Sequence, residues 1–575
     1  MIAHDEKVRD SVARDVLLIL LLAAVLFLPA LWTRDLWSPD EPRYMAVGWG
    51  MAQTGDYLVP RLSGYLYPDK PPLFFWLAAF LYRVGLGLNS GRVVAALAAV
   101  GTVLVTYFLA QRRMGGRAGL MAASVTLTLA FFLATAKTGV IDPLVTFLIV
   151  STIACGLRAM EPKTQAARRW WLAAYALGGL AVLTKGPVGM AVPLLVLMTY
   201  GLAMRGKIKG GGWAHLPGVL LMLNIVGWWL IPALVSGGDA YAKEIVFSQT
   251  SKRLVHSTSH QGPFYHYLLI LPGILIPWTL LFVPAAWSAW LAWRREREPV
   301  AVLGLAWFFS IFLFFSIISG KRMGYILPLA PAAGLLLARY LMMAEDGRLA
   351  WPRLHRALTG ITLAAIAVAA VLMFAGAMVS VPVTGTLFPK HPELKDEVAR
   401  LARGLALVLA LPMALMLALV VFSWRRAMAR PWALVSVLIG LMLIASLTLD
   451  LAVLPRGNYF KSGKNFVEAV RADLATADRV YLFKSDFSGV YNIYTGRVAI
   501  PVLRANSSEL RNALVGPERV AVIGRDTDLY KELGKPLPLG RIAEQVRVGH
   551  RVMLLVVNWS EAAPVQAPGS SPRQL

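Results

Sequence analysis

The sequence predicts a polytopic α-helical membrane protein with a small soluble α/β domain near its C-terminal end. Of its 575 residues, 57% are hydrophobic and only 15% are charged, whereas soluble domains carry about 25% charged residues. Runs of about twenty apolar residues recur along most of the chain, which is the length a membrane-spanning helix needs. After Pro455 the composition changes, because charges there interleave with short β-branched runs. A disordered, collagen-like or coiled-coil chain is excluded.

The charge balance is strongly basic, with 57 Lys and Arg against 32 Asp and Glu and a net charge of +25. No nucleic-acid-binding motif accompanies this charge, so we expect no nucleic-acid partner. Cytoplasmic loops of membrane proteins are rich in Lys and Arg, which accounts for the excess. Cys155 is the only cysteine and lies in an apolar run, which excludes an intramolecular disulfide and a cysteine-based metal site.

The positions of the basic clusters predict the topology. The first apolar stretch lacks a small-residue cleavage site, so it is interpreted as a retained helix. Basic clusters at every second turn place the N-terminus inside and the C-terminus outside, provided that Pro71–Leu88 forms a juxtamembrane or re-entrant helix on the outer side. About thirteen spans follow: Val16–Trp32, Val93–Ala110, Ala118–Ala136, Val140–Leu157, Trp171–Leu183, Val188–Met204, Leu216–Val235, Tyr267–Trp290, Val300–Ile318, Tyr325–Met342, Leu358–Val379, Leu401–Phe422 and Trp432–Leu454.

The predicted domains follow from these spans. Residues 1–455 form the transmembrane domain, with a first outer loop at 33–90 and a second at 236–266. Residues 456–560 form the α/β domain, with strands in RVYLFK, VAIPVL, RVAVIG and VMLLVVN that alternate with helices at Lys464–Leu474, Ser508–Leu514 and Asp526–Leu533. The tail at 561–575 is rich in Pro, Ser and Ala and is expected to be disordered.

Two polar groups in the first outer loop predict a site at the outer membrane surface. Asp40 and Glu41 directly follow the first helix and precede Arg43 and Tyr44, on a short helix that Pro42 opens. The alternative is that the acidic pair only stabilises the start of that helix. The second group lies just before a Pro-Pro break and contains Tyr67, Asp69 and Lys70. The two groups together suggest one site.

Basic residues on the outer side strengthen this prediction, because the positive-inside rule predicts few of them there. We call them the cationic rim and expect it to bind a lipid phosphate or pyrophosphate: Lys70, Lys137, Lys185, Lys252, Arg253, Lys321 and Arg322. For each one the alternative is an anchor at the lipid headgroups. Asp142 is a carboxylate near the outer face, and its expected partner is Lys137 or another lysine of the rim. Tyr325 would place a phenol beside two of these cations.

The second outer loop contains His256, His260 and His266. With Asp69 or Glu41 these histidines could supply ligands for Zn²⁺, Mn²⁺ or Mg²⁺. Their spacing matches no standard metal motif, and the alternative is that they are polar loop residues bonded to the backbone.

The sequence resembles the lipid-A-modifying aminoarabinose transferases, which belong to the protein O-mannosyltransferase-like branch of the GT-C membrane glycosyltransferases. The resemblance covers about Leu36 to Pro331. It depends on a set of motifs in order: WSPDEPRY, GDYLVPRL, YPDKPPL, RRMGGR, KTGVIDP, TKGP, HQGPFYHY and KRMGYILPLAP. It implies a bacterial inner-membrane enzyme with a periplasmic active site. Such an enzyme transfers 4-amino-4-deoxy-L-arabinose from undecaprenyl phosphate to a lipid A phosphate and gives resistance to polymyxin-type peptides.

The resemblance also assigns roles to residues. It implies that Asp40 is the essential acid, that Lys70, Arg253 and Tyr325 bind the carrier phosphate, and that Asp69 and a loop histidine such as His256 or His260 hold a metal. One departure is that this chain has Asp69-Lys70-Pro71 where the family has Glu-Lys-Pro. From the residues we add Glu41 and Asp142 as catalytic candidates. The substrate-binding candidates are Arg43, Tyr44, Tyr67 and Lys185.

The chemistry is consistent with this resemblance. A sugar linked through phosphate already has a good leaving group, so neutralising the departing phosphate would do much of the work. No P-loop or Rossmann fingerprint is present, so no nucleotide cofactor is expected. We expect a monomer surrounded by membrane lipids. Two alternatives are open: transfer of another polyprenyl-phosphate sugar to a glycolipid or to protein Ser/Thr, and a lipid flippase or transporter.

Overall fold

The computed structural model describes residues 2–162, 164–205, 207–208, 212–245, 261–379, 395–484, 488–505, 508–548 and 551–560. The chain forms two compact units. The membrane unit consists of the chain up to Arg34, Thr54–Pro60 and Leu66–Pro455. The second unit consists of Asp35–Gln53, Arg61–Tyr65 and the chain from Arg456 on.

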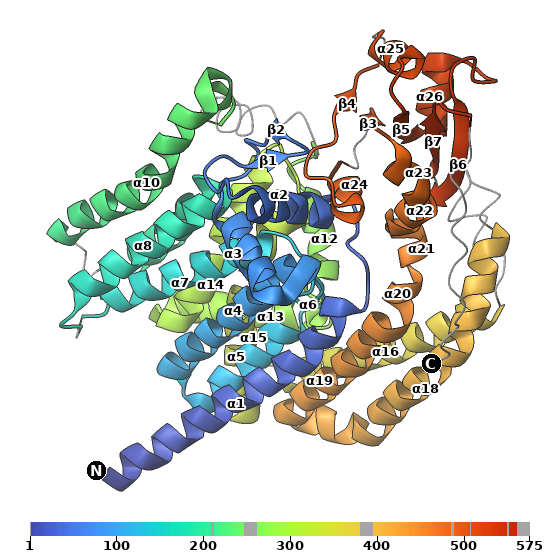
Figure 1. Ribbon diagram of the computed structural model, residues 1–575. Coiled ribbons are helices and arrows are strands. Elements are labelled where there is room, and N and C mark those ends of the chain that lie inside the picture. Colours follow the sequence, from blue (N-terminus) through green and yellow to red (C-terminus); the bar gives the residue numbers. More distant parts are fainter. Residues whose placement is uncertain are drawn as a thin grey trace. The chain divides into compact units, whose positions relative to one another are not determined.

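The membrane unit is built from helices (Figure 1). Its longer helices are α1 (Ile2–Trp32), α3 (Leu73–Leu81), α4 (Ser90–Met114), α5 (Gly116–Thr128), α6 (Ala130–Ala136), α7 (Asp142–Ala159), α8 (Ala167–Lys185), α9 (Val188–Ala203), α10 (His215–Ala242), α12 (His266–Ile274), α13 (Thr279–Glu296), α14 (Pro299–Ile317), α15 (Ala330–Glu345), α16 (Pro352–Val379), α18 (Lys395–Ala429) and α19 (Pro431–Thr448). Short turns join some of them: η1 (Tyr82–Leu86), η2 (Gly87–Asn89), η3 (Gly212–Ala214), η5 (Met323–Leu329), η7 (Leu449–Val453) and α20 (Leu454–Arg456).

Each of the thirteen predicted spans is largely helical, but fewer meet the requirements for a membrane crossing. In the described part of the chain, eight helical segments are long and apolar enough, or up to ten if two bent pairs each count as one span. Helix α9 is apolar but has only 16 residues. The chain is therefore a multi-pass membrane protein, and the predicted count of about thirteen is higher than length and composition support.

Two of the predicted spans are broken helices that contact each other. Helices α5 and α6 bend by 71° at Leu129, and α12 and α13 bend by 111°. The freed backbone groups are satisfied across the breaks, since the Ala130 amide donates to the Ile276 carbonyl at 2.8 Å. The Trp278 indole nitrogen donates to the Thr128 hydroxyl at 3.0 Å. Irregular backbone at membrane depth is tolerated where protein groups satisfy it in this way.

The segment predicted to be re-entrant folds back on itself. Helix α3 has nine residues, about 14 Å at 1.5 Å per residue, which is too short to cross a bilayer. Gly85 interrupts the helical backbone of the following turn with φ 99°. A Cβ on Gly91 would lie 3.5 Å from the Phe74 ring, whereas a straight helix would separate these residues by about 25 Å. The chain thus reverses between α3 and α4.

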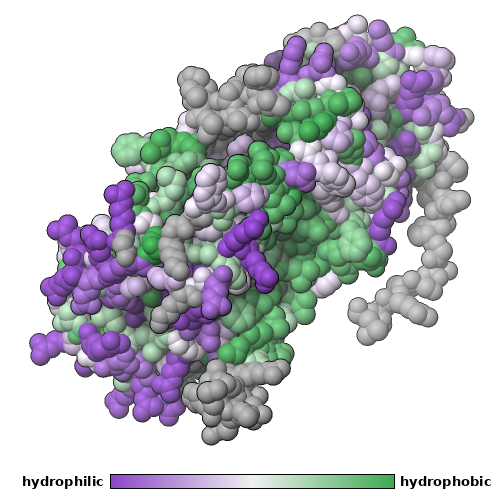
Figure 2. Space-filling model, turned by 90° about the vertical axis from the view of Figure 1, so that its left-hand side faces the viewer, coloured by the Kyte–Doolittle hydropathy of each residue, from purple (hydrophilic) through white to green (hydrophobic). Residues whose placement is uncertain are grey.

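The surface of the membrane unit is apolar where lipid would cover it. On the face seen in Figure 2, hydrophobic side chains form a broad surface bordered by hydrophilic ones. Helix α10 carries many exposed apolar side chains, including Trp228 at 78% and Val235 at 79% exposure. A soluble monomer rarely exposes so large an apolar area, so this surface is typical of a membrane protein.

The second unit contains a mixed five-stranded sheet in the order β4-β3-β5-β7-β6 (Figure 1). Strands β3, β4 and β5 are parallel, and β7 pairs antiparallel with β5 and β6. The elements are α2 (Asp40–Thr54), β1 (Arg61–Leu62), β2 (Tyr65–Leu66), α21 (Asn458–Lys461), α22 (Lys464–Ala469), α23 (Arg471–Thr476), β3 (Arg479–Phe483), α24 (Ser488–Thr495), β4 (Val502–Leu503), α25 (Glu509–Val515), β5 (Val520–Arg525), α26 (Asp526–Leu533), β6 (Arg541–Val548) and β7 (Arg551–Val557).

Side chains that alternate along the strands form two cores, one on each face of this sheet. Leu482 and Ile523 pack with α22, α23 and α24 on one face. Phe483 and Val522 pack with α25 and α26 on the other. The four predicted strands and three predicted helical stretches are present, but β6 and α24 were not predicted. The β6 sequence RIAEQVRV is half exposed, and the α24 sequence SGVYNIYT contains few strong helix formers.

Candidate functional site

Three predicted site residues meet in the membrane unit, and we call Asp142, Lys185 and Tyr325 the acid–lysine–tyrosine cluster. The Lys185 ammonium donates to the Asp142 carboxylate as a close ion pair. The same ammonium lies 4.6 Å from the centre of the Tyr325 ring, a cation–π contact. The two charged side chains keep 11% and 19% of their surface exposed. The prediction that Asp142 pairs with a lysine of the rim is confirmed, and that lysine is Lys185.

Local sequence places each member of the cluster. Asp142 begins α7 and is followed by Pro143, whose fixed φ suits the first turn of a helix. Lys185 is the last residue of α8, which ends because Gly186 adopts a φ of 81° that only glycine takes without strain. Tyr325 lies in the 3-10 turn η5. Its neighbour Gly324 backs directly onto Asp142, because a Cβ there would lie 2.5 Å from the carboxylate.

The turn that carries Tyr325 is fixed by two further residues. The Tyr267 hydroxyl donates to the Arg322 carbonyl at 3.0 Å. The Lys321 ammonium is buried and donates to the carbonyls of Phe315 at 2.9 Å and Ser316 at 2.6 Å, which are at the end of α14 where backbone carbonyls lack helical partners. Lys321, predicted as part of the cationic rim, therefore caps a helix.

A second lysine–aspartate pair lies elsewhere in the membrane unit. The Lys137 ammonium donates to Asp450 Oδ2 at 2.5 Å and to the Ser446 hydroxyl at 2.7 Å. The Asp450 side chain is completely buried, and that of Lys137 is 9% exposed. The pair joins the end of α6 to the irregular turn η7 after α19. Lys137 was also predicted to belong to the rim, but its partner and burial make it a structural residue.

The second polar group of the first outer loop consists of Tyr67, Asp69 and Lys70. The Tyr67 amide donates to the Pro60 carbonyl at 2.8 Å. The Tyr67 ring is buried and packs edge to face on Phe75 at 6.1 Å. Asp69 and Lys70, in the following turn, are partly buried. Their predicted roles in metal and phosphate binding stay predictions.

The acidic pair belongs to the second unit. Asp40 begins helix α2 and lies 3.7 Å from the Arg43 guanidinium. Glu41 is buried, and its carboxylate accepts a hydrogen bond from the Trp37 amide at 3.1 Å. Tyr44 is buried too. The helix that Pro42 was predicted to open is confirmed, and Glu41 also stabilises the turn before it. A catalytic role for Asp40 or Glu41 stays a prediction. The same is true of a single site that combines this acidic pair with Tyr67, Asp69 and Lys70.

The structure describes only part of the second outer loop. Arg253, His256 and His260 lie outside the described residues, as does the tail at 561–575. Within the residues that the structure describes, no three His, Cys, Asp or Glu side chains lie close enough to hold a metal ion. Asp69, Glu41 and His266 are the proposed ligands that the structure describes, and the metal stays a prediction.

Gly324 and Tyr267 are parts of the site that were not predicted from the sequence. Gly324 leaves the space that the Asp142 carboxylate occupies, and Tyr267 holds the Arg322 carbonyl. A signal existed for both, because they belong to the KRMGYILPLAP and HQGPFYHY motifs. Within those motifs, the charged and imidazole side chains and Tyr325 were predicted to lie at the site, and Gly324 and Tyr267 were not.

Known proteins match part of this chain. Residues 69–231 match the family described as dolichyl-phosphate-mannose-protein mannosyltransferase. An uncharacterized protein of Aquifex aeolicus is 30% identical over 56% of this chain and 63% of its own length. The undecaprenyl phosphate-alpha-4-amino-4-deoxy-L-arabinose arabinosyl transferase 2 of Proteus mirabilis is 27% identical over 56% of this chain and 59% of its own length. The matches thus span about three fifths of these curated relatives.

Solved structures extend the similarity to nearly the whole chain. The crystal structure of ArnT from Cupriavidus metallidurans in the apo state matches with a TM-score of 0.75 and 25% identity, over 95% of this chain and 98% of that one. The chain has a GT-C fold. The same protein bound to undecaprenyl phosphate matches with a TM-score of 0.75 and 24% identity, over 96% and 99%. The predicted fold class and the resemblance to aminoarabinose transferases are confirmed, and this GT-C fold includes the α/β region at the C-terminal end.

Proposed function

We propose that this protein transfers 4-amino-4-deoxy-L-arabinose from undecaprenyl phosphate to a phosphate group of lipid A. The observation that carries the proposal is the similarity to relatives named for this sugar and carrier. The match to ArnT over nearly the full length of both chains supports it. By the same reasoning we place the protein in the bacterial inner membrane with its active site on the periplasmic side. The product would give resistance to polymyxin-type peptides.

The reaction needs charge neutralisation more than proton transfer. The bond between the anomeric carbon and the carrier phosphate breaks, and its electron pair stays on the phosphate oxygen. An oxygen of the acceptor phosphate forms the new bond to the anomeric carbon. Fixed cations near the departing phosphate stabilise the charge that develops there. We assign this part to Lys70 and Arg253, with the Tyr325 hydroxyl as a hydrogen-bond donor.

Within the acid–lysine–tyrosine cluster, the geometry favours substrate binding by Lys185. Asp142 holds the Lys185 ammonium from one side and the Tyr325 ring contacts it. Because its carboxylate is engaged by Lys185, we propose that Asp142 acts as a positioning residue rather than as a base. Lys185 keeps part of its surface accessible, so that it can also contact an oxygen of the substrate. Asp40 would orient the acceptor, bind the amine of the sugar or stabilise the positive anomeric carbon.

The metal is a separate part of the proposal, and no step above depends on it. Asp69, His256 and His260 would hold a divalent cation, which when bound would add positive charge for the carrier phosphate. Elemental analysis of the purified protein tests this. We expect about one Zn²⁺ or Mn²⁺ per chain, which is lost in a His256→Ala/His260→Ala variant; a chain that purifies without metal and has full activity would contradict it.

A second candidate keeps the fold and changes the acceptor or the sugar. The matched family is described by transfer of mannose to protein. Transfer of another polyprenyl-phosphate sugar to a glycolipid or to protein Ser/Thr is therefore the alternative. The donor-phosphate chemistry would be the same, so only substrate assays separate the two.

Mass spectrometry of lipid A tests the proposal. The host is a bacterium that lacks its own transferase but still makes the aminoarabinose carrier, and it expresses this chain or its Asp40→Asn variant. We expect the mass of one or more aminoarabinose groups on lipid A with the unchanged chain and not with the variant, at equal amounts of folded protein. Unmodified lipid A with both, despite folded expression, would favour the alternative.

A further inference from the structure

Part of the first outer loop folds with the C-terminal domain. Residues 35–53 and 61–65 belong to the same compact unit as the chain from Arg456 on, although most of the membrane unit lies between them in the sequence. Helix α2 in the first of these pieces begins at Asp40, the proposed essential acid. The contacts that the domain makes with this piece therefore bear directly on the acid.

The turn that leads into α2 is bonded to α21 and α24. Asn458 Oδ1, in α21, accepts hydrogen bonds from the Asp35 amide at 3.1 Å and from the Trp37 indole at 2.9 Å. The Tyr494 hydroxyl, in α24, accepts a hydrogen bond from the Leu36 amide at 3.2 Å. Two of these three donors are backbone amides, so the bonds fix the course of the chain just before α2.

The first turn of α2 lies against Gly489, a buried residue of α24. A Cβ on this glycine would lie 2.7 Å from the Cα atom and 2.8 Å from the amide nitrogen of Arg43. Both are backbone atoms, so they cannot move away unless the helix itself shifts. The Arg43 guanidinium lies 3.7 Å from Asp40. The backbone that rests on Gly489 thus belongs to the same helical turn as the acid.

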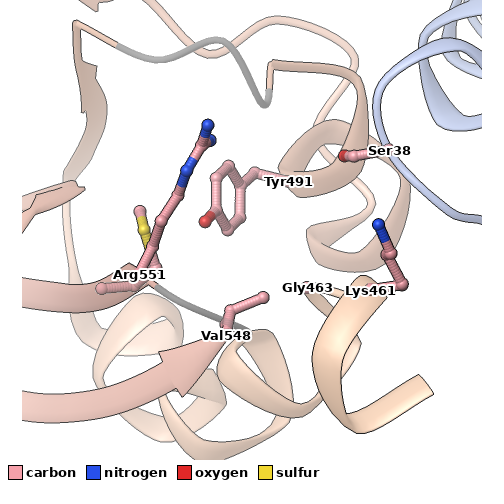
Figure 3. A pocket seen from close by; sticks show the side chains of 7 residues that line it. Ser38, Lys461, Gly463, Tyr491, Val548 and Arg551 are labelled. Atoms are coloured by element: carbon pink, nitrogen blue, oxygen red, sulfur yellow. The ribbon is translucent and has the colours of Figure 1, made fainter. Parts of the chain in front are cut away.

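Side chains from these elements also meet around one small cavity (Figure 3). Ser38, in the turn before α2, lines this cavity together with Lys461 of α21 and Tyr491 of α24. Tyr491 is 1% exposed, and its ring packs edge to face on Phe466 at 5.8 Å in one of the two cores of the sheet. The turn before α2 therefore rests on elements that the core of the domain holds in place.

The second piece of the first loop contacts α24 as well. The Ser63 side chain is buried, and its hydroxyl donates to Asn492 Oδ1 at 3.0 Å. The same oxygen accepts a hydrogen bond from the Ile500 amide at 3.3 Å. One helix of the C-terminal domain thus contacts both pieces of the loop.

We propose that Asn458 and Gly489 are positioning residues for Asp40, through which the C-terminal domain holds the turn and the first helical turn that carry the acid. This inference rests on the proposed function, because it takes Asp40 as the acid of the transfer. A carboxylate that orients a substrate acts only at a defined place, and a misplacement of about 1 Å can lower a rate about 10²-fold. By this route the domain contributes to turnover without touching the substrate.

Hydrogen–deuterium exchange of the full chain in phosphatidylcholine nanodiscs tests whether the domain holds the turn. Asn458→Leu removes the acceptor oxygen, so we expect residues 35–44 to exchange at least tenfold faster, with β5 and β7 unchanged. Asn458→Asp keeps an acceptor oxygen and should restore slow exchange. Asn512→Leu is the matched control, because it removes an exposed amide side chain from α25 of the same unit.

Gly489→Ala tests the packing of α2 independently of the hydrogen bonds. We expect the same region to exchange at least tenfold faster, because the added methyl group displaces the helix backbone. Gly516→Ala is its control, since a Cβ there would meet its nearest atom at an ordinary 3.6 Å. Tyr494→Phe removes only a hydroxyl, so it keeps the test valid if the stronger variants do not fold, with exchange at least threefold faster.

Turnover of the same variants tests whether the position of the turn matters for transfer. We expect kcat per folded molecule to fall at least tenfold in Asn458→Leu and Gly489→Ala, and to recover in Asn458→Asp. The KM for the undecaprenyl-linked donor should stay within twofold of the unchanged value, because the residues assigned to the carrier phosphate belong to the membrane unit. A merely structural role would lower the amount of folded enzyme and leave its kcat unchanged.

Two results would overturn the proposal. One is unchanged exchange of residues 35–44 in the variants, and the other is faster exchange with a normal kcat. If the unchanged chain transfers no aminoarabinose at all, the proposed function fails, and the exchange measurement still decides whether the domain holds the turn.

Discussion

The membrane unit contains two lysine–aspartate pairs that look alike in the sequence and differ in their surroundings. Lys137 and Asp450 are 9% and 0% exposed, and the Ser446 hydroxyl bonds to both of them. Lys185 and Asp142 are 11% and 19% exposed and lie against the ring of Tyr325. Both lysines were predicted to form part of one phosphate-binding rim. The two lysines are almost equally buried, so the clear difference between the pairs is at the acid, which is partly exposed in Asp142 and fully buried in Asp450.

The difference shows what burial does to an ion pair. Burying a charge costs free energy, and only the attraction to its partner offsets that cost. Removing one residue of a buried pair therefore leaves the other charge unpaired and destabilises the fold. A partly exposed pair keeps access to solvent and substrate, so its charge is available for chemistry. We therefore expect that breaking the Lys137–Asp450 pair lowers stability and that breaking the Lys185–Asp142 pair lowers turnover.

The largest effect is expected for Lys137→Met. This change leaves the Asp450 carboxylate buried without its cation, which costs about 3–5 kcal/mol. Thermal unfolding in detergent should show a clearly lower Tm, while turnover per folded molecule stays near the unchanged value. The double variant Lys137→Met/Asp450→Leu should recover most of the stability, since replacing both partners by apolar groups is close to neutral. A double variant as unstable as the single one would contradict a structural role for the pair.

Lys185→Met should act on turnover instead. Loss of one preorganised charge or donor beside a developing anion lowers kcat by about 10²–10³-fold. The Tm should change little, because Asp142 retains access to water. Transfer to purified lipid A from the undecaprenyl-linked donor measures the rate. Lys207→Met is the control, because Lys207 is an exposed lysine outside the cluster; a Lys185→Met rate equal to that of the control would remove Lys185 from the site.

Gly324→Ala tests whether the position of Asp142 matters. The new methyl group would lie 2.5 Å from the Asp142 carboxylate. The shifts of side chain and backbone that such overpacking forces typically destabilise a protein by about 1–3 kcal/mol. If the added methyl group moves Asp142 away from Lys185, turnover should fall about 5- to 150-fold, which corresponds to about 1–3 kcal/mol. Gly404→Ala meets no atom within 4 Å and serves as the matched control. An unchanged rate would show that the pair tolerates displacement.

The smallest effects are expected at Tyr325, where two substitutions separate the ring from the hydroxyl. Tyr325→Leu removes the cation–π contact, worth about 0.5–2 kcal/mol, or roughly 2- to 30-fold in turnover. Tyr325→Phe keeps the ring over Lys185 and removes only the hydroxyl proposed to bind the carrier phosphate. Measured KM for the donor should rise in both variants if the hydroxyl binds phosphate. A wild-type KM in Tyr325→Phe would restrict Tyr325 to holding Lys185.

The sequence predicted the helices well because their signal is local. Every predicted span falls on a helix, since about twenty apolar residues must form one in a bilayer, where each backbone group needs an internal partner. The breaks at Leu129 and between α12 and α13 were missed because the bonds that stabilise them come from the other broken helix. In the α/β domain, continuous apolar strands were found and the half-exposed strand β6 was not.

The candidate site was predicted in its residue types more than in its pairings. Asp142, Lys185 and Tyr325 were all named, but so were Lys137 and Lys321, which the structure assigns to a buried pair and a helix cap. From the sequence, each is a lysine near an outer helix end, and nothing local distinguishes them. The partners of the two paired lysines lie farther along the chain: Asp450 is 313 residues from Lys137, and Asp142 is 43 residues from Lys185.

The sequence by itself thus determined the class of the protein, its helices, the change to a soluble domain after Pro455 and the set of charges near the predicted outer face, because composition and periodicity are properties of neighbouring residues. Only the tertiary structure decided which lysine faces which acid, how much water each pair retains, and that Asn458 bonds to the turn before α2. The physical reason is that the strength of an electrostatic interaction depends on distance and burial, and both are set by contacts between segments that are far apart in the sequence.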